Sequence, residues 1–290
     1  MVAGDMLAAA RPDVVRRTCR HDGEGHWIVQ LAASRPEAML RGAQLLRETG
    51  VDVIDINMGC PSRQVTGAQS GSALMRDVPL ALEIIQAALD GADGLPVTLK
   101  MRLGWDDKNI TAPNLVRVLE DVGVTAIFIH GRTREQGFTG TVNLAGIRQV
   151  VEAARGIPVI GNGDITTPES ARHMMDVTGC HGVSTGRGAF YNPWIFKHTK
   201  HHLRTGELLP EPRFAERVRV MRRHFDLMLE VFGEQRGCLM FRKVAPWYAK
   251  RFGPVKPFNK AVVLISTRED FESALAGYLD WRQQFADADG

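Results

Sequence analysis

One cysteine stands in a setting that suits a reactive thiol. Cys60 lies between Gly59, which permits a sharp turn, and Pro61, which restricts the backbone, shortly after the apolar run 51–56 and Asn57. A thiol on such a turn can act as a nucleophile or as a general acid, and the alternative is a buried structural cysteine. The polar, conformationally restricted surroundings favour a chemical role for Cys60.

Cationic and polar side chains follow two further apolar runs. Lys100 and Arg102 alternate along the run 97–102, so both point to the same side of a strand. Two cations there call for an anion or an electron-rich ring, because an inward-facing charge is costly without a partner. His130 ends the next run, where it could donate a hydrogen bond to a cofactor or be a satisfied core histidine.

Glycine-rich segments follow the last two apolar runs. Their residues are Asn162, Gly163 and Asp164 in the first segment, and Gly186 and Arg187 in the second. Glycine lets backbone N–H groups approach a phosphate, and the arginine adds a charge-assisted contact. No Gly-x-Gly-x-x-Gly pattern follows a strand, which argues against a Rossmann dinucleotide site. A single phosphate-binding site beside polar groups, without a cluster of metal ligands, indicates bound FMN and no metal.

The elements that must position these residues alternate along the chain. Val- and Ile-rich runs, each expected to be a strand buried on both faces, cover 27–32, 51–56, 97–101, 126–130, 157–161 and 182–185. Helical patterns are expected at 35–49, 79–89, 114–122, 143–154 and 168–177. This alternation predicts an α/β fold with a parallel sheet. Polar residues after six successive strands favour a TIM (β/α)8-type barrel over a doubly wound sheet.

The pattern changes to long amphipathic helices after residue 193. These helices are expected at 193–204, 212–232, 234–252 and 267–286. We therefore predict a flavin-binding barrel domain over 1–200 and an all-helical domain over 201–290. Residues 191–265 contain 15 Lys or Arg and 6 Asp or Glu, whereas residues 1–190 contain 19 and 21. The basic excess indicates an anionic partner such as a nucleic acid, with a solvated helix surface as the alternative.

Composition sets broad limits on the class of protein. The 290 residues are 44% hydrophobic and 24% charged, with a net charge of +3, which excludes an intrinsically disordered chain. No run approaches the ~20 apolar residues of a membrane helix. The first residues do not read as a secretory signal, so a cytoplasmic location without a membrane partner is expected. The four cysteines are widely spaced, which argues against a disulfide framework or a zinc site.

Seven segments of the sequence occur in the order and spacing of a known family. They are VQLAA, DINMGCP, GSALM, VTLKMR, IHGRT, GNGDI and TGRGAFYNPWIF. Together they resemble the tRNA-dihydrouridine synthases, most closely the bacterial B subgroup, over about residues 27–252. The resemblance implies reduction of uridine to 5,6-dihydrouridine in the D-loop of tRNA, with NADPH as the reductant of FMN. Reduced FMN would pass a hydride to C6 of the uracil, and Cys60 would protonate C5.

The resemblance also implies a role for each matching position. The implied FMN ligands are Gln30, Lys100, His130, Asn162, Gly163, Asp164, Gly186 and Arg187. Asn57 and Arg102 are implied to face the substrate base. Arg242 and Lys243, which open an RK-x-x-x-WY stretch, are implied to contact the tRNA from the helical domain.

The sequence departs from the family pattern at three places. Gln64 stands where the family carries Lys or Arg, and Val244 stands where the subgroup often has His. Residues 1–26 contain no Pro-Met-Ala-Gly-like strand end, so the barrel is expected to lack its first strands. Either Met1 then lies downstream of the true start, or the barrel is open beside the flavin.

Two alternatives to a tRNA-dihydrouridine synthase stay open at the level of sequence. One is another FMN barrel, similar to dihydropyrimidine or dihydroorotate dehydrogenases, which would act on free pyrimidines and would not need a basic helical domain. The other is a non-catalytic tRNA-binding remnant, because a barrel without its first strands has an unclosed sheet.

Overall fold

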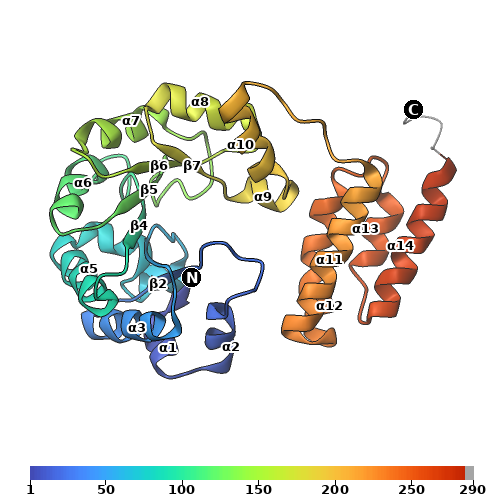
Figure 1. Cartoon of the computed structure of the whole chain (residues 1–290), viewed down its shortest axis with the longest axis horizontal. Helices are drawn as coiled ribbons and strands as arrows, with labels where there is room; N and C mark the ends of the chain where they lie inside the picture. Colours follow the sequence, from blue (N-terminus) through green and yellow to red (C-terminus); the bar gives the residue numbers. More distant parts are fainter. Residues whose placement is uncertain (285–290) are drawn as a thin grey trace. The chain divides into compact units, whose positions relative to one another are not determined.

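Seven parallel strands form the sheet of this protein, in a computed structural model that describes residues 1–284 (Figure 1). They are β1 (Val2–Ala3), β2 (Ile28–Ala32), β3 (Val53–Met58), β4 (Val97–Arg102), β5 (Ala126–His130), β6 (Val159–Asn162) and β7 (Gly182–Ser184). Their order in the sheet is their order in the chain, and each neighbouring pair is parallel. The six predicted strands are confirmed. The two residues of β1 are too few to give a sequence pattern.

Helices cover the outer side of this curved sheet, as expected for the TIM-barrel type of α/β fold, which is confirmed (Figure 1). The helices of this part of the chain are α1 (Gly4–Ala8), α2 (Pro12–Val15), α3 (Pro36–Thr49), α4 (Arg63–Gly67), α5 (Val78–Ala92), α6 (Ala112–Asp121), α7 (Leu144–Ala153) and α8 (Pro168–Thr178), of which α3, α5, α6, α7 and α8 lie around the sheet in Figure 1; the 3₁₀ turns are η1 (Arg16–Thr18) and η2 (Gly71–Arg76). A proline in the first turn begins α3, α5 and α6, where its missing N–H costs no hydrogen bond. The α3 helix is capped at its C-terminus by Gly50, whose φ of 82° favours glycine.

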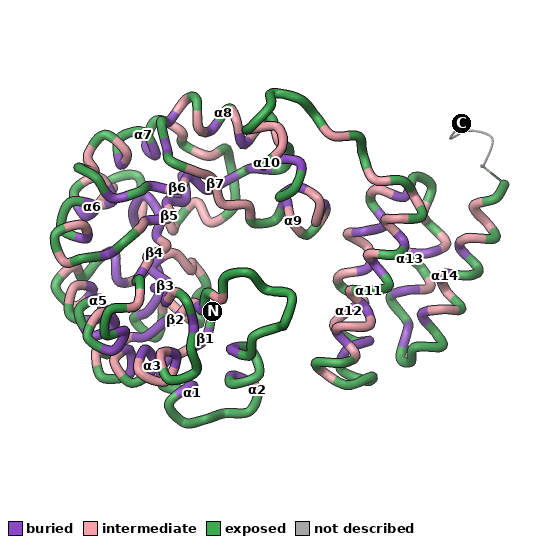
Figure 2. The backbone as a smooth tube through the Cα atoms, viewed as in Figure 1, coloured by how far each residue is buried: buried purple, intermediate pink, exposed green. Residues whose placement is uncertain are grey.

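The core of the sheet lies between the strands and these helices. Leu31, Ile54, Ile56, Leu99 and Ile127 have no exposed surface, and Figure 2 shows buried residues along the strands and the adjoining sides of the helices. Burial on both faces explains the Val- and Ile-rich runs of the strands, although β3 (VIDINM) and β4 (VTLKMR) also alternate apolar with polar residues. Several polar side chains, among them Asn57, Lys100, Arg102, His130 and Asn162, lie in the carboxyl-terminal halves of their strands.

The register of the sheet places predicted site residues side by side. Asn57 pairs with Lys100, and Arg102 pairs with His130, which itself pairs with Asn162. Because parallel strands all end at the same edge, these side chains lie along the carboxyl edge of β3, β4, β5 and β6. The fold therefore brings together residues that are more than 100 positions apart in the chain.

The chain divides into two compact units. The sheet unit comprises residues 1–165 and 170–185, and the helical unit comprises residues 166–169 and 186–290. The helical unit contains α9 (Arg187–Tyr191), α10 (Ile195–Thr205), α11 (Phe214–Phe232), α12 (Glu234–Ala249), α13 (Lys256–Val262) and α14 (Arg268–Arg282). The boundary between the two units, after residue 185, lies before the predicted domain boundary at residue 200. Residues 285 and 286 of the helix predicted at 267–286 lie outside the described residues.

Aromatic side chains hold the helical unit together. Phe225 lies with its ring centroid 4.2 Å from that of Phe271 and 4.9 Å from that of Phe241, and all three are fully buried. Phe190 of α9 stacks on Trp247 of α12 at 4.6 Å, which joins the start of this unit to its centre. Over residues 1–284, we find no helix with the length and apolar character needed to cross a membrane.

Candidate active site

The turn that carries Cys60 is held by hydrogen bonds on both sides of the cysteine. Its N–H donates to Oδ1 of Asn57 at 2.9 Å, and its carbonyl accepts the N–H and the hydroxyl of Ser72 at 3.2 and 2.9 Å. Gly71 has a φ of 61°, and a Cβ there would lie 3.0 Å from the Cys60 carbonyl oxygen. The GSALM segment thus positions Cys60, whose free thiol belongs to a partly exposed residue.

A chain of side-chain amides fixes the orientation of this turn. Buried Asp55 accepts hydrogen bonds from Nε2 of Gln30 at 2.5 Å and from Oγ1 of Thr98 at 2.7 Å. Because Gln30 directs its NH₂ group to the carboxylate, its Oε1 faces Asn57 and accepts from Nδ2 at 2.7 Å. Asn57 then presents Oδ1 to the N–H of Cys60. Sequence reasoning missed Asp55, although it lies within the DINMGCP segment.

Burial dominates the charge state of Asp55. It raises the pKa of this carboxyl above its ordinary value, while the hydrogen bonds from Thr98 and Gln30 and the charge of Lys100 act in the opposite direction. The ionised carboxylate is therefore expensive to bury but well supplied with donors. Its position between β2 and β4 makes it the common anchor of both neighbouring strands.

Lys100 provides an ammonium group at the carboxyl edge of β4. Its Nζ donates to Oδ1 of Asn162 at 3.0 Å, and Asn162 donates through Nδ2 to the Ser184 carbonyl at 2.7 Å. Burial, with a smaller effect of Arg102, lowers the pKa of Lys100 to about 8, and Asp55 partly opposes this. A lysine held by a neutral amide keeps donors for an electron-rich or anionic ring, and the implied contact of Lys100 with FMN stays a prediction.

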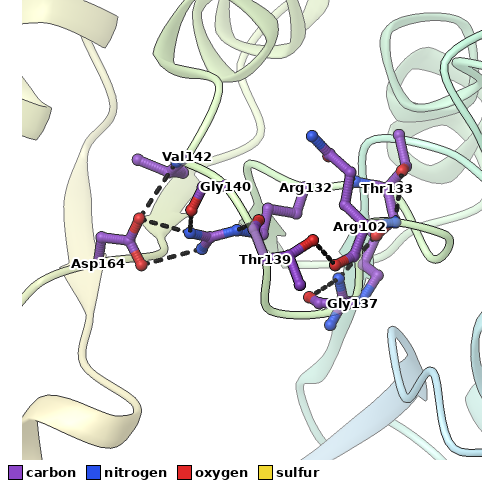
Figure 3. Close-up of polar contacts among 9 residues, drawn as sticks. Arg102, Arg132, Thr133, Gly137, Thr139, Gly140, Val142 and Asp164 are labelled. Carbon is purple, nitrogen blue, oxygen red and sulfur yellow. Dashed lines mark hydrogen bonds and ion pairs between the residues drawn. The ribbon is translucent and has the colours of Figure 1, made fainter.

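Arg102 is 2% exposed and binds three backbone carbonyls, of which those of Thr133 and Gly137 belong to residues labelled in Figure 3. Its Nε donates to Gly59, and its Nη1 donates to Thr133 and Gly137, each at 2.8 Å. Burial and the neighbouring Arg132 lower its pKa to about 10, so it stays charged at neutral pH. Arg102 therefore ties the Cys60 turn to the loop after β5, and its implied contact with the substrate base stays a prediction.

A second buried arginine organises the loops after β5 and β6, as Figure 3 shows. Arg132, 1% exposed, donates from Nη1 and Nη2 to the two oxygens of Asp164 at 2.9 and 2.6 Å. It also donates to the carbonyls of Thr139 and Gly140 at 2.9 and 2.6 Å. Sequence reasoning did not single out Arg132. The carboxylate of Asp164 is engaged by it, so the implied contact of Asp164 with FMN stays a prediction.

His130 is neutral at the edge of β5. Burial above all, and then the charges of Arg102, Lys100 and Arg132, lower its pKa to about 3. A neutral imidazole offers one donor and one acceptor. Gly163 has a φ of 127°, and a Cβ there would lie 3.1 Å from Cδ2 of His130, so glycine lets the β6 loop pass close to the ring.

The remaining predicted residues belong to the helical unit. Gly186 and Arg187 lie at the start of α9, and their part in binding FMN stays a prediction. Arg242 donates to the carbonyls of Ile265 and Leu264 at 2.8 and 3.3 Å, and so holds the loop between α13 and α14. Lys243 is exposed. Contact of Arg242 and Lys243 with tRNA stays a prediction.

No group of three or more His, Cys, Asp or Glu side chains that could hold a metal ion occurs within residues 1–284. The arrangement instead joins a thiol on a rigid turn to an ammonium group, a neutral imidazole and oriented amides. Such a set can position an electron-rich ring and deliver a proton to a substrate beside it.

Comparison with known proteins identifies the family independently of the site geometry. A sequence model of the dihydrouridine synthase (Dus) family matches residues 1–282. A probable tRNA-dihydrouridine synthase of Rickettsia conorii is 37% identical over 261 residues, covering 90% of this chain and 78% of the relative. The tRNA-dihydrouridine synthase B of Xanthomonas campestris is 40% identical over 266 residues (89% and 80%). That of Pseudomonas putida is 38% identical over 292 residues (100% and 86%).

Proposed function

The chain belongs to the dihydrouridine synthase family, a family of enzymes, and we propose that it reduces uridine to 5,6-dihydrouridine in the D-loop of tRNA in the cytoplasm. The observation that carries this proposal is the Cys60 turn, whose backbone is fixed at both its N–H and its carbonyl. It lies at the same edge of the sheet as Lys100, His130 and Asn162. Reduction of an electron-poor C5=C6 bond needs a proton donor of this kind beside a hydride donor.

The residues of this edge fit FMN as the cofactor. Lys100, Gln30, His130 and Asn162 would hold its ring, because they offer one ammonium group and several neutral donors to an electron-rich ring system. Gly186 and Arg187 would hold its phosphate, as the loops after the last barrel strands commonly do. When bound and reduced by NADPH, FMN supplies the hydride for C6 of the uracil.

Cys60 completes the reduction by donating the proton of its Sγ to C5. With the backbone fixed on both sides, rotation of the side chain is the main freedom left to the thiol. Since Cys60 is partly exposed, solvent can return a proton to the thiolate after each turnover. Asn57 orients the turn and lies beside the base in this proposal, while Arg102 fixes the Gly59 carbonyl.

The uridine must leave its stack to reach Cys60, which costs a few kcal/mol. Phosphate contacts made elsewhere on the tRNA offset this cost, and we assign them in part to Lys243 and Arg242 of the helical unit. The basic excess of residues 191–265 supports this assignment.

The direct test is an assay of the purified full chain with NADPH and unmodified tRNA. We expect FMN to copurify, and nucleoside mass spectrometry to show dihydrouridine in the tRNA. Reduction of free uracil or orotate in place of tRNA would identify a reductase of free pyrimidines. A colourless protein that binds tRNA without modifying it would identify a binding protein, and either outcome would overturn the proposal.

A further inference from the structure

Trp105 lies between loops of the sheet unit and carries two guanidinium groups on its ring. The Cζ atom of Arg76 lies 4.7 Å from the ring centroid, and that of Arg134 lies 4.5 Å from it. Arg76 ends η2, Trp105 follows β4 and Arg134 follows β5, so all three belong to loops at the carboxyl edge of the sheet. They do not include any of the residues assigned above to Cys60, FMN or the base.

A pocket of about 370 Å³ opens beside this arrangement. Its lining includes Arg76, Trp105, Asp106, Asn109 and Thr111. The hydroxyl of Thr111 is buried without a hydrogen-bond partner, although buried polar atoms in proteins nearly always have one. The Nε of Arg134, whose guanidinium group lies on the Trp105 ring, is also buried without a hydrogen-bond partner. Thr111 lines the same pocket as Trp105, and Arg134 lies on the Trp105 ring, so each has a buried polar atom without a partner among the described residues.

Arg76, which lines the pocket, and Arg134, which lies on the Trp105 ring, are both without acidic partners among the described residues. Among residues 1–284, neither arginine forms an ion pair with a carboxylate. The neighbouring Asp77 accepts the N–H of Leu80 at 3.1 Å and so begins α5. Asp106 accepts the side-chain amide of Asn109 at 2.7 Å and the N–H of Lys108 at 2.9 Å. The nearby carboxylates are therefore engaged in local turns.

An arginine stacked on an indole ring is held in place without using its N–H groups. Those N–H groups then remain as donors, and their planar arrangement matches the oxygens of a phosphate. Because two guanidinium groups already contact the Trp105 ring, the ring serves to hold cations rather than to stack on a base. This favours a phosphate of a nucleic-acid backbone over the ring of a nucleotide cofactor.

We propose that Arg76 and Arg134, each held by Trp105, bind backbone phosphates of the tRNA at the carboxyl edge of the sheet. The proposal rests on the proposed function, because it takes tRNA as the substrate. It assigns part of the tRNA contact to the sheet unit, in addition to the basic surface of the helical unit. Because Arg76 is exposed, RNA in solution can reach it more readily than Arg134.

The test measures tRNA affinity of the full FMN-loaded chain as a function of salt. Each phosphate contact contributes about 0.7–0.9 to the slope of log affinity against log salt concentration. We expect Arg76→Gln to weaken tRNA binding several-fold at low salt and to reduce this slope by about 1. Trp105→Leu should have a similar effect, and Arg76→Lys should retain most of the slope because it keeps the charge.

The matched control is Arg41→Gln, which removes an exposed arginine of α3 that lies 3.9 Å from Glu48. It should leave the slope unchanged. The rate at which NADPH reduces the bound FMN without tRNA should be the same in all these variants. An unchanged slope in Arg76→Gln, or a defect confined to reduction by NADPH, would overturn the phosphate assignment. If the parent chain itself makes no dihydrouridine, the proposed function fails instead.

Discussion

Replacing Asp55 tests whether the amide chain behind Cys60 depends on one buried acceptor. Asp55→Ala leaves Nε2 of Gln30 and Oγ1 of Thr98 without their acceptor. An unsatisfied buried donor costs about 1–3 kcal/mol, so two would cost about 2–6 kcal/mol. Part of this loss is offset because the variant no longer buries a carboxylate, whose burial is unfavourable, as the raised pKa of Asp55 indicates. We therefore expect a loss of about 2–4 kcal/mol in the free energy of unfolding.

Asp55→Asn is the matched variant, because it keeps an oxygen for Gln30. The Thr98 hydroxyl can turn to accept from the new NH₂ group, so the loss should be below about 1 kcal/mol. Urea unfolding followed by circular dichroism gives both values by linear extrapolation. Equal stability of the two variants, within about 0.5 kcal/mol, would refute the reasoning because that is the size of an ordinary surface substitution.

The same pair of chains makes a signed prediction about pH. Because the pKa of Asp55 is raised in the folded chain, the folded state binds this proton more tightly than the unfolded state. The resulting stability is complete below the ordinary pKa of an aspartate and is lost as the pH rises through the raised value. Asp55→Asn lacks this titration, so the parent should gain stability relative to Asp55→Asn on acidification through that range. A gap that is independent of pH would contradict the direction of the shift.

Three further predictions concern the site. Ser72→Ala removes the hydroxyl that binds the Cys60 carbonyl, and we expect a loss of about 1 kcal/mol in unfolding free energy and slower dihydrouridine formation at unchanged FMN content. Asp164→Ala leaves buried Arg132 without its carboxylate, and urea unfolding should show a loss of about 2–4 kcal/mol in the free energy of unfolding. The loss is smaller than for a fully buried ion pair because Asp164 is partly exposed. Since the pKa of Lys100 is lowered to about 8, FMN affinity in a fluorescence titration should fall as the pH rises through about 8, and Lys100→Met should abolish that dependence.

Sequence predicted the sheet well because strands buried between helices leave short runs rich in Val and Ile. The run 126–130 coincides with β5, and the run 97–101 misses only the last residue of β4. Elements too short to show a period gave no such signal, as with β1 and the seven-residue α13. Because parallel strands end at a common edge, the polar residues after the six predicted strands were enough to place the candidate site at that edge.

The partners of the buried arginines were beyond the reach of sequence. Arg102 binds the carbonyls of Gly59, Thr133 and Gly137, and a backbone carbonyl leaves no mark on residue type. Arg132 finds its carboxylate 32 positions later in the chain, through loops whose path depends on the whole sheet. Sequence identified polar residues at the edge, but only the structure separates those that hold loops from those that remain available to a ligand.

The most direct test of the account is dihydrouridine formation by Cys60→Ala, with Cys19→Ala as the matched control because Cys19 is an exposed free cysteine. Each protein is mixed with NADPH and unmodified tRNA, and dihydrouridine is counted by nucleoside mass spectrometry. We expect Cys60→Ala to keep its FMN and its oxidation of NADPH while losing about 10²–10⁴-fold in dihydrouridine formation. Cys19→Ala should match the parent chain. Parental activity in Cys60→Ala on unmodified tRNA would contradict the assignment of Cys60 as the acid.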